Sequence, residues 1–234
     1  MRLKGDIIIM SSLEKQKSSR LKEILIVAYL CFAILSFVII LIIPFTREEF
    51  SKLSLKQPYL MGFIKFALLA TAGELIAAYI VNGEATVPVK VVWKFIIWGF
   101  IGVWITFMMG VYKTAVAGMG LGGESKFLSA FFISLIMNTT FGPTFMAIHK
   151  CTDKFLELRA KKEKANLTEV VKNIDWSNFF SFTLLKTVPL FWIPAHTITF
   201  LLPAQYQVMM AAGLSVALGV ILSFGNRRKA SKEK

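Results

Sequence analysis

Residues Phe127–Ile148 read FLSAFFISLIMNTTFGPTFMAI, an apolar run about as long as the ~20 residues that a helix needs to cross a bilayer. Its interior carries the polar and helix-breaking stretch Asn138–Thr144. Because hydrocarbon offers such groups no hydrogen bonds, this stretch must face protein or a wet cavity. The run therefore predicts a membrane-spanning helix and marks the first place to look for a functional site.

Five further apolar runs lie on either side of this one. They are Ile24–Ile43, Tyr59–Val81, Val91–Tyr112, Phe179–Leu202 and Val208–Phe224. Each is near the length of a membrane crossing, and six crossings leave little chain for a soluble domain. We therefore expect an all-α fold, a polytopic integral membrane bundle of about six transmembrane helices.

The basic residues are distributed unevenly between the two sides that six crossings would create. The chain carries a net charge of +13, and the amino-terminal segment, the loops 82–90 and 149–178 and the tail together hold 19 basic residues, against 5 on the opposite side. The positive-inside rule then places both termini in the cytoplasm. The Ile- and Lys-rich composition favours a bacterial cytoplasmic (inner) membrane.

The same charge pattern bears on partners. Basic residues at a membrane surface attract anionic lipid, which we expect at the cytoplasmic face beside the bilayer itself. No recognition motif for nucleic acid accompanies the charge, so we expect no nucleic acid. A homo-oligomer remains an open possibility.

The chain divides by composition. Residues 1–23 form a basic cytoplasmic segment, 24–58 an added anchor helix with an external loop, 59–224 the membrane bundle and 225–234 a basic tail. Within the bundle, residues 149–178 form a cytoplasmic link. Asn166 followed by Glu169 has capping-box spacing and predicts the start of an amphipathic helix there.

Three ionisable residues lie well inside the predicted spans. Each of Lys65, Glu74 and Lys186 costs at least ~2.5 kcal/mol near the bilayer centre unless it is paired or wetted. Lys65 and Glu74 are nine residues apart, on opposite sides of one helix, so they cannot pair. We predict that Glu74 pairs with Lys186, and that Lys65 extends toward the interface. Both a polar pathway and a structural ion pair fit this arrangement.

Prolines predict irregular helices in the second half of the chain. Pro189, Pro194 and Pro203 interrupt or end the fifth span, and Gly142-Pro143 interrupts the fourth. Proline removes a backbone donor and kinks a helix, and such breaks at membrane depth often build solute sites.

Small residues predict close helix contacts. Gly99, Gly102 and Gly110 lie in the third span, and the sixth span holds a series of small residues, Ala211, Ala212, Ser215 and Gly219. Small residues let two helix backbones approach each other, so this is a packing signal.

Two other patterns have plain structural interpretations. The stretch Gly118–Gly123 has the spacing of a dinucleotide fingerprint, but it follows no strand, and we expect a turn. His149 and Asp153 lie one helical turn apart and His196 lies in a later span, which is too few ligands to predict a metal. We expect His196 to form an interhelical hydrogen bond. No cofactor and no enzymatic activity are expected, because no set of catalytic residues can be recognised in the sequence.

Several short motifs occur in an order that resembles the peroxisomal membrane protein family, which includes mitochondrial inner-membrane relatives. They are Gly73-Glu74, Gly110-Val111-Tyr112-Lys113, Phe141-Gly142-Pro143, Trp192-Ile193-Pro194, the stretch Thr199–Gln207 and Ile221-Leu222-Ser223-Phe224. The resemblance covers roughly residues 59–224 and implies a divergent, bacterial member. It implies an integral membrane protein, and a channel or pore role is proposed for some members.

This chain departs from the family pattern at polar positions. Met137 and Asn138 stand where the family has an aspartate, Thr199 replaces an asparagine and Gln207 replaces an arginine. The resemblance therefore implies the fold more strongly than any activity.

The function expected from the sequence is a small channel-like or solute-conducting membrane protein. Its polar pathway would be lined by Asn138, Thr139, Thr140, Thr144, Glu74 and Lys186. A carboxylate in such a pathway favours cations. The alternative is a non-conducting binding or membrane-integrity protein, or the substrate-capture subunit of a larger transporter. A cavity beside Asn138–Thr144 would favour the pathway, and dry packing there would favour a structural role.

Overall fold

The computed structural model describes residues 2–82 and 91–232, with side chains placed for residues 20, 21, 23–81, 91–221, 223 and 224. The described chain is all-α, as the sequence predicts. Its helices are α1 (Arg2–Ile42), α2 (Pro44–Lys56), α3 (Pro58–Asn82), α4 (Val91–Gly118), α5 (Lys126–Ala160), α6 (Leu167–Lys172), α7 (Trp176–Asn178), the π-helix η1 (Phe179–Trp192), α8 (Ile193–Leu201) and α9 (Ala204–Lys232). Lys90 and the rest of the loop used in the charge count lie outside the described residues.

Six helical segments are long and apolar enough to cross a membrane. They are Glu23–Ile42, Pro58–Val81, Val91–Gly118, Lys126–Ala160, Trp176–Leu201 and Ala204–Ile221. Each matches one of the six apolar runs, and large apolar side chains remain exposed along them. These features indicate a multi-pass membrane protein.

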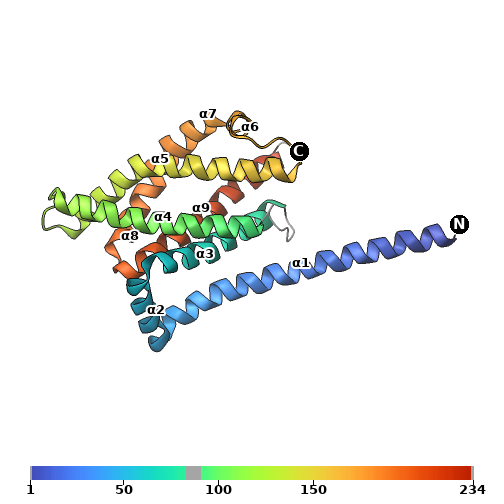
Figure 1. The fold of residues 1–234 in the computed structure, drawn as a ribbon, viewed down its shortest axis with the longest axis horizontal. Helices are drawn as coiled ribbons and strands as arrows, with labels where there is room; N and C mark the ends of the chain where they lie inside the picture. Colours follow the sequence, from blue (N-terminus) through green and yellow to red (C-terminus); the bar gives the residue numbers. More distant parts are fainter. Residues whose placement is uncertain (1, 83–90, 233–234) are drawn as a thin grey trace.

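The centre of the bundle is helix α3, which packs against α4 and α9, while α5 packs against α8 and α4 (Figure 1). The core between these helices includes the fully buried side chains of Phe66 and Met109. A Cβ atom added to Gly102 would overlap the carbonyl oxygen of Gly62, so α3 and α4 approach backbone to backbone. The predicted contacts at Gly99 and Gly102 are therefore confirmed, whereas Gly110 has open space around it.

The first helix stands apart from the rest. Helix α1 diverges from α3 and carries the N-terminus far beyond the bundle (Figure 1). The Tyr29 hydroxyl ties it to α3 by donating a hydrogen bond to the Leu68 carbonyl at 2.8 Å. The predicted external loop after it is instead helix α2, which begins with proline at its first turn, a position where a missing N–H costs nothing.

The fifth span is irregular, but the fourth is not. Pro189 lies inside the π-helix η1, Pro194 begins α8, and Leu202 takes an extended conformation before Pro203, so these prolines do mark irregular backbone. By contrast, α5 continues through Gly142 and Pro143 as one helix, so the predicted break in the fourth span is wrong. One missing donor does not end a 35-residue helix, because the neighbouring turns keep their hydrogen bonds.

The bundle has two chemically different ends. At one end lie the end of α3, the start of α4, the end of α5 and the short helices α6 and α7; we call this the basic end. At the other end lie α2, the break between α8 and α9, and the turn after α4; we call this the glycine-loop end. Gly120, Gly122 and Gly123 all have positive φ, so the expected turn there is confirmed.

The link after α5 is partly as predicted. The Asn166 side chain caps α6 by accepting a hydrogen bond from the Glu169 amide at 2.9 Å. Val170 and Ile174 are buried against Leu158 of α5, whereas Leu167 is exposed. The helix is short, and only part of its apolar stripe faces the bundle.

Candidate functional site

A chain of ionisable side chains joins three helices near the basic end. Lys94 Nζ of α4 lies 2.7 Å from Glu74 Oε2 of α3 and 3.2 Å from Asp153 Oδ1 of α5. The other Asp153 oxygen lies 3.5 Å from His149 Nε2. The Trp98 indole N–H donates to Glu74 Oε1 at 2.8 Å. We call Glu74, Lys94, His149 and Asp153 the charged cluster.

The order of helices α3 and α4 in the chain explains how the charged cluster forms. Glu74 lies in the second half of α3 and Lys94 near the start of α4, and the packing of these two helices brings them side by side. Both side chains are largely shielded, with 18% of Lys94 and 19% of Glu74 exposed. The predicted pair between Glu74 and Lys186 is therefore wrong, because Lys94 is the closer cation on the helix that packs against α3.

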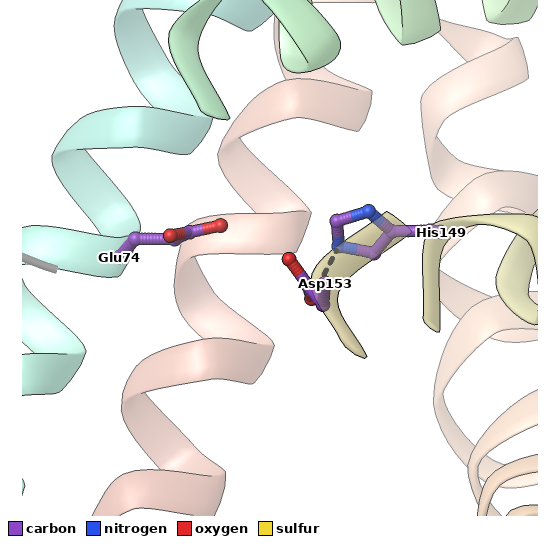
Figure 2. Close-up of side chains that lie close together, drawn as sticks. All are labelled: Glu74, His149 and Asp153. Carbon is purple, nitrogen blue, oxygen red and sulfur yellow. Dashed lines mark ion pairs between the residues drawn. The ribbon is translucent and has the colours of Figure 1, made fainter. Parts of the chain in front are cut away.

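Three of these side chains are arranged as potential metal ligands. Glu74, His149 and Asp153 each offer a ligand atom, and these atoms lie within 4.8 Å of one another (Figure 2). The sequence spacing showed only the pair on α5 and missed the contribution of Glu74. In this structure the Lys94 ammonium already lies between the two carboxylates, so it supplies the positive charge that a cation would bring.

A cavity of about 340 Å³ lies beside the charged cluster, a volume typical of a small-molecule site. Its wall is formed by α3, α5, η1 and α9, together with Trp98 of α4. Two buried donors or acceptors on this wall, His149 Nδ1 and Trp192 Nε1, have no hydrogen-bond partner among the described residues. Both nitrogen atoms are covered by protein, so they contribute no polar surface to the cavity.

A second polar group lies deeper in the bundle, around Asn138. Its amide nitrogen donates to the Ser134 carbonyl at 2.8 Å, and its Oδ1 lies 3.1 Å from His196 Nδ1. The interhelical hydrogen bond expected of His196 is thus confirmed. The Ser134 hydroxyl also crosses between helices, donating to the Ile193 carbonyl at 2.7 Å. These bonds hold α5 against α8 at the depth of the polar stretch.

A small cavity of about 40 Å³ lies against Asn138 and His196. It has room for at least one water molecule. Four residues line both this cavity and the larger one, namely Phe145, Met146, Trp192 and Ser215. The two cavities therefore adjoin, and together they extend from the charged cluster to Asn138.

The other residues of the predicted pathway do not line the two cavities. Thr139, Thr140 and Thr144 are exposed, and the first two donate their hydroxyls to carbonyls of their own helix at 2.8 and 2.6 Å. The Thr140 oxygen also lies 2.7 Å from the Tyr112 hydroxyl of α4, so Thr140 takes part in a contact between helices. Lys186 is exposed on η1. A pathway lined by these four residues is therefore not formed within one copy of the chain, because the α5 face that is buried holds Ser134, Asn138 and Phe141 instead.

Gly142 does not shape the small cavity by a close approach of two helices. Gly142 lines the small cavity, but a Cβ there would meet only ordinary contacts, 3.7 Å from the Met137 carbonyl. The side chains that sequence reasoning missed are Lys94 and Trp98, whereas His149 and Asp153 were recognised only as a pair one helical turn apart. The signal that could have identified Lys94 is its position near the start of the helix that follows Glu74 in the chain.

Comparison with models of known protein families, with curated proteins and with solved structures finds no match. The geometry of the two adjoining cavities therefore carries the functional argument.

Proposed function

We propose that this chain is a channel-like membrane protein that conducts small solutes along a polar route inside the bundle. The observation that carries the proposal is the pair of adjoining cavities, which extend from the charged cluster to Asn138 and His196. Polar side chains at membrane depth are costly unless they pair with one another or face water, and both polar groups here lie beside a cavity. The route differs from the sequence-based prediction, since it uses Glu74 and Asn138 but not the threonines or Lys186.

The charged cluster supplies the field at the entrance of this route. Glu74 and Asp153 are two carboxylates that share Lys94, and Lys150 also lines the larger cavity, so the described carboxylates and ammonium groups balance there. The carboxylate oxygens are the groups that would attract a cation. The proposed solutes are small cations, which these oxygens can bind.

The route is tested by blocking the place where the two cavities meet. Ser215 lies on α9 and lines both cavities, so Ser215→Phe fills the junction. The purified full chain is reconstituted into liposomes, and potassium efflux is followed with an ion-selective electrode. The unmodified chain is expected to conduct, and Ser215→Phe is expected to lower the efflux to that of empty liposomes.

A matched control lies on the opposite side of the same helix. Ala217 is exposed on the outer face of α9, so Ala217→Phe adds the same side chain outside the cavities. Efflux through this variant should equal that of the unmodified chain. Equal efflux through Ser215→Phe and Ala217→Phe, or no efflux through the unmodified chain, contradicts the proposal.

One observation favours a second candidate, a non-conducting binding protein or capture subunit. The small cavity ends against the packed core formed by Phe66, Met137 and Phe141, all of which are buried. A blind cavity suits a bound solute better than a permeating one. Saturable binding of a small cation to protein whose liposomes show no efflux would favour this candidate over conduction.

The membrane and the family are part of the proposal. We place the chain in a bacterial inner membrane with both termini and the basic end on the cytoplasmic side, because the basic residues gather there. The residues of the resemblance support membership of the peroxisomal membrane protein family, with anionic lipid at the cytoplasmic face. Glu74, which follows Gly73 in one of those motifs, belongs to the charged cluster.

A further inference from the structure

A second lysine is buried at the opposite end of the bundle, and it has no carboxylate partner among the side chains that the structure describes. Only 3% of Lys65 is exposed. Its ammonium donates to the Ser54 hydroxyl and to the Gln205 carbonyl, each at 2.9 Å, and lies 4.5 Å from the centre of the Phe50 ring. Lys65 therefore extends toward the near end of the bundle, where it reaches Ser54 of α2 and Gln205 of α9, but its ammonium is covered by protein. Neutral oxygens and a ring face orient the ammonium, but they leave its charge uncompensated.

Lys65 lines a cavity of about 250 Å³ at the glycine-loop end. Lys113 of α4, which is partly buried, lines the same cavity. Where side chains are described, no carboxylate lines this cavity and neither lysine takes part in an ion pair. The nearby acids of α2, Glu48 and Glu49, are exposed and are bound to Lys52. The cavity therefore has two positive charges on its wall and no negative charge.

Helix ends of both polarities also line the cavity. The first residues of α3 and α9, Pro58 and Ala204, lie on its wall, and so do Ser54 and Leu55 in the last turn of α2. A helix N-terminus carries partial positive charge and favours an anion, whereas a helix C-terminus carries partial negative charge. These opposing dipoles leave the two lysines as the main source of positive potential in the cavity.

We propose that this cavity binds an oxyanion, a phosphate group that is either a free small anion or the headgroup of a lipid. The anion supplies the charge that Lys65 and Lys113 lack, and phosphate oxygens accept the hydrogen bonds that two ammonium groups can donate. The Ser54 hydroxyl offers a further donor next to Lys65. The site does not depend on conduction, because it lies at the other end of the bundle from the charged cluster.

The site is tested by calorimetric titration of the full chain, stripped of lipid in an uncharged detergent. Inorganic phosphate is one probe and soluble dihexanoyl phosphatidic acid is the other, each compared with chloride at equal ionic strength. Saturable binding of either probe is expected. Binding of phosphate identifies a free anion, and binding of the short-chain lipid alone identifies a headgroup. Binding of neither probe overturns the proposal.

Two variants locate the binding. Lys113→Gln removes one ammonium from the partly exposed part of the wall and should weaken binding about tenfold or more. Lys65→Met should abolish binding. If Lys65→Met does not fold, the binding measured for Lys113→Gln tests the site on its own.

The control is Lys126→Gln, which removes an exposed lysine at the same end of the bundle without touching the cavity. It should bind the probe as tightly as the unmodified chain. Equal weakening by Lys126→Gln and Lys113→Gln would show a diffuse charge effect and overturn the site. Unchanged binding by Lys113→Gln would overturn it as well.

Discussion

The two ends of this bundle each bury a lysine, but they treat its charge in opposite ways. At the basic end, Lys94 lies between the carboxylates of Glu74 and Asp153. At the glycine-loop end, the polar and aromatic contacts of Lys65 with described residues are a hydroxyl, a carbonyl and an aromatic ring. The first charge is compensated within the protein, and the second is not.

This difference indicates two roles for a shielded lysine, one in holding the helices together and one in binding a ligand. In a buried ion pair the opposite charges compensate each other, and removing one partner leaves a buried charge without a counter-charge. A buried ammonium without a counter-charge is costly, and a ligand can lower that cost by binding. The comparison assigns Lys94 to the architecture of the proposed route and Lys65 to the recognition of an anion.

The largest expected loss of stability comes from forcing apart helices α3 and α4, which pack against each other in the centre of the bundle. Gly102→Ala places a Cβ against the carbonyl oxygen of Gly62, so α3 and α4 must move apart. We expect a loss of about 3 kcal/mol in the free energy of unfolding, measured by chemical unfolding in detergent. Gly110→Ala, on the same helix with open space, should be neutral or slightly stabilising. Equal losses in the two variants would contradict the close approach.

The next largest loss of stability is expected from replacing Lys94, the lysine whose charge is compensated. Lys94→Met leaves Glu74 and Asp153 without their cation, and we expect the free energy of unfolding to fall by about 2 kcal/mol. The estimate is below that for a fully buried pair because 41% of Asp153 is exposed. Adding Glu74→Gln to Lys94→Met should recover part of the loss. A single variant as stable as the unmodified chain would show that the charged cluster is not a structural unit.

The smallest change of stability is expected from replacing Lys65, the lysine whose charge is not compensated. In buffer without phosphate, Lys65→Met should change the free energy of unfolding by no more than about 1 kcal/mol, in either direction. Removing the ammonium relieves its desolvation and keeps an apolar side chain of similar length over Phe50. A loss larger than that of Lys94→Met, measured in the same unfolding experiment, would contradict the distinction between the two ends.

The membrane-spanning helices could be predicted from the sequence because crossing a bilayer requires a length that apolar runs reveal directly. The need of Glu74 for a partner could also be predicted, since an unpaired carboxylate at membrane depth is costly. The identity of the partner could not, because it depends on which helices pack together. Lys94 packs beside α3, whereas Lys186 faces away from the bundle.

The polar stretch Asn138–Thr144 of the fourth span was likewise only partly predictable from the sequence. Composition alone indicated polar surroundings for Asn138 and its neighbours, and Asn138 indeed bonds to Ser134 and His196. The rotation of α5 decides which residues share that environment, and it turns Thr139 and Thr140 away from the two cavities. Their hydroxyls bond to carbonyls one turn earlier, so a threonine at membrane depth needs no cavity.

The central claim is that the cavities beside the charged cluster are wet as far as the Asn138 group, and thiol labelling tests it most directly. In a chain with Cys31 and Cys151 replaced by serine, Ser215→Cys places a thiol at the junction of the cavities, and Ala212→Cys places one in the fully buried core of the same helix. A small, charged methanethiosulfonate applied at the basic end should modify Ser215→Cys and leave Ala212→Cys unmodified. A folded Ser215→Cys variant as unreactive as Ala212→Cys would contradict the account.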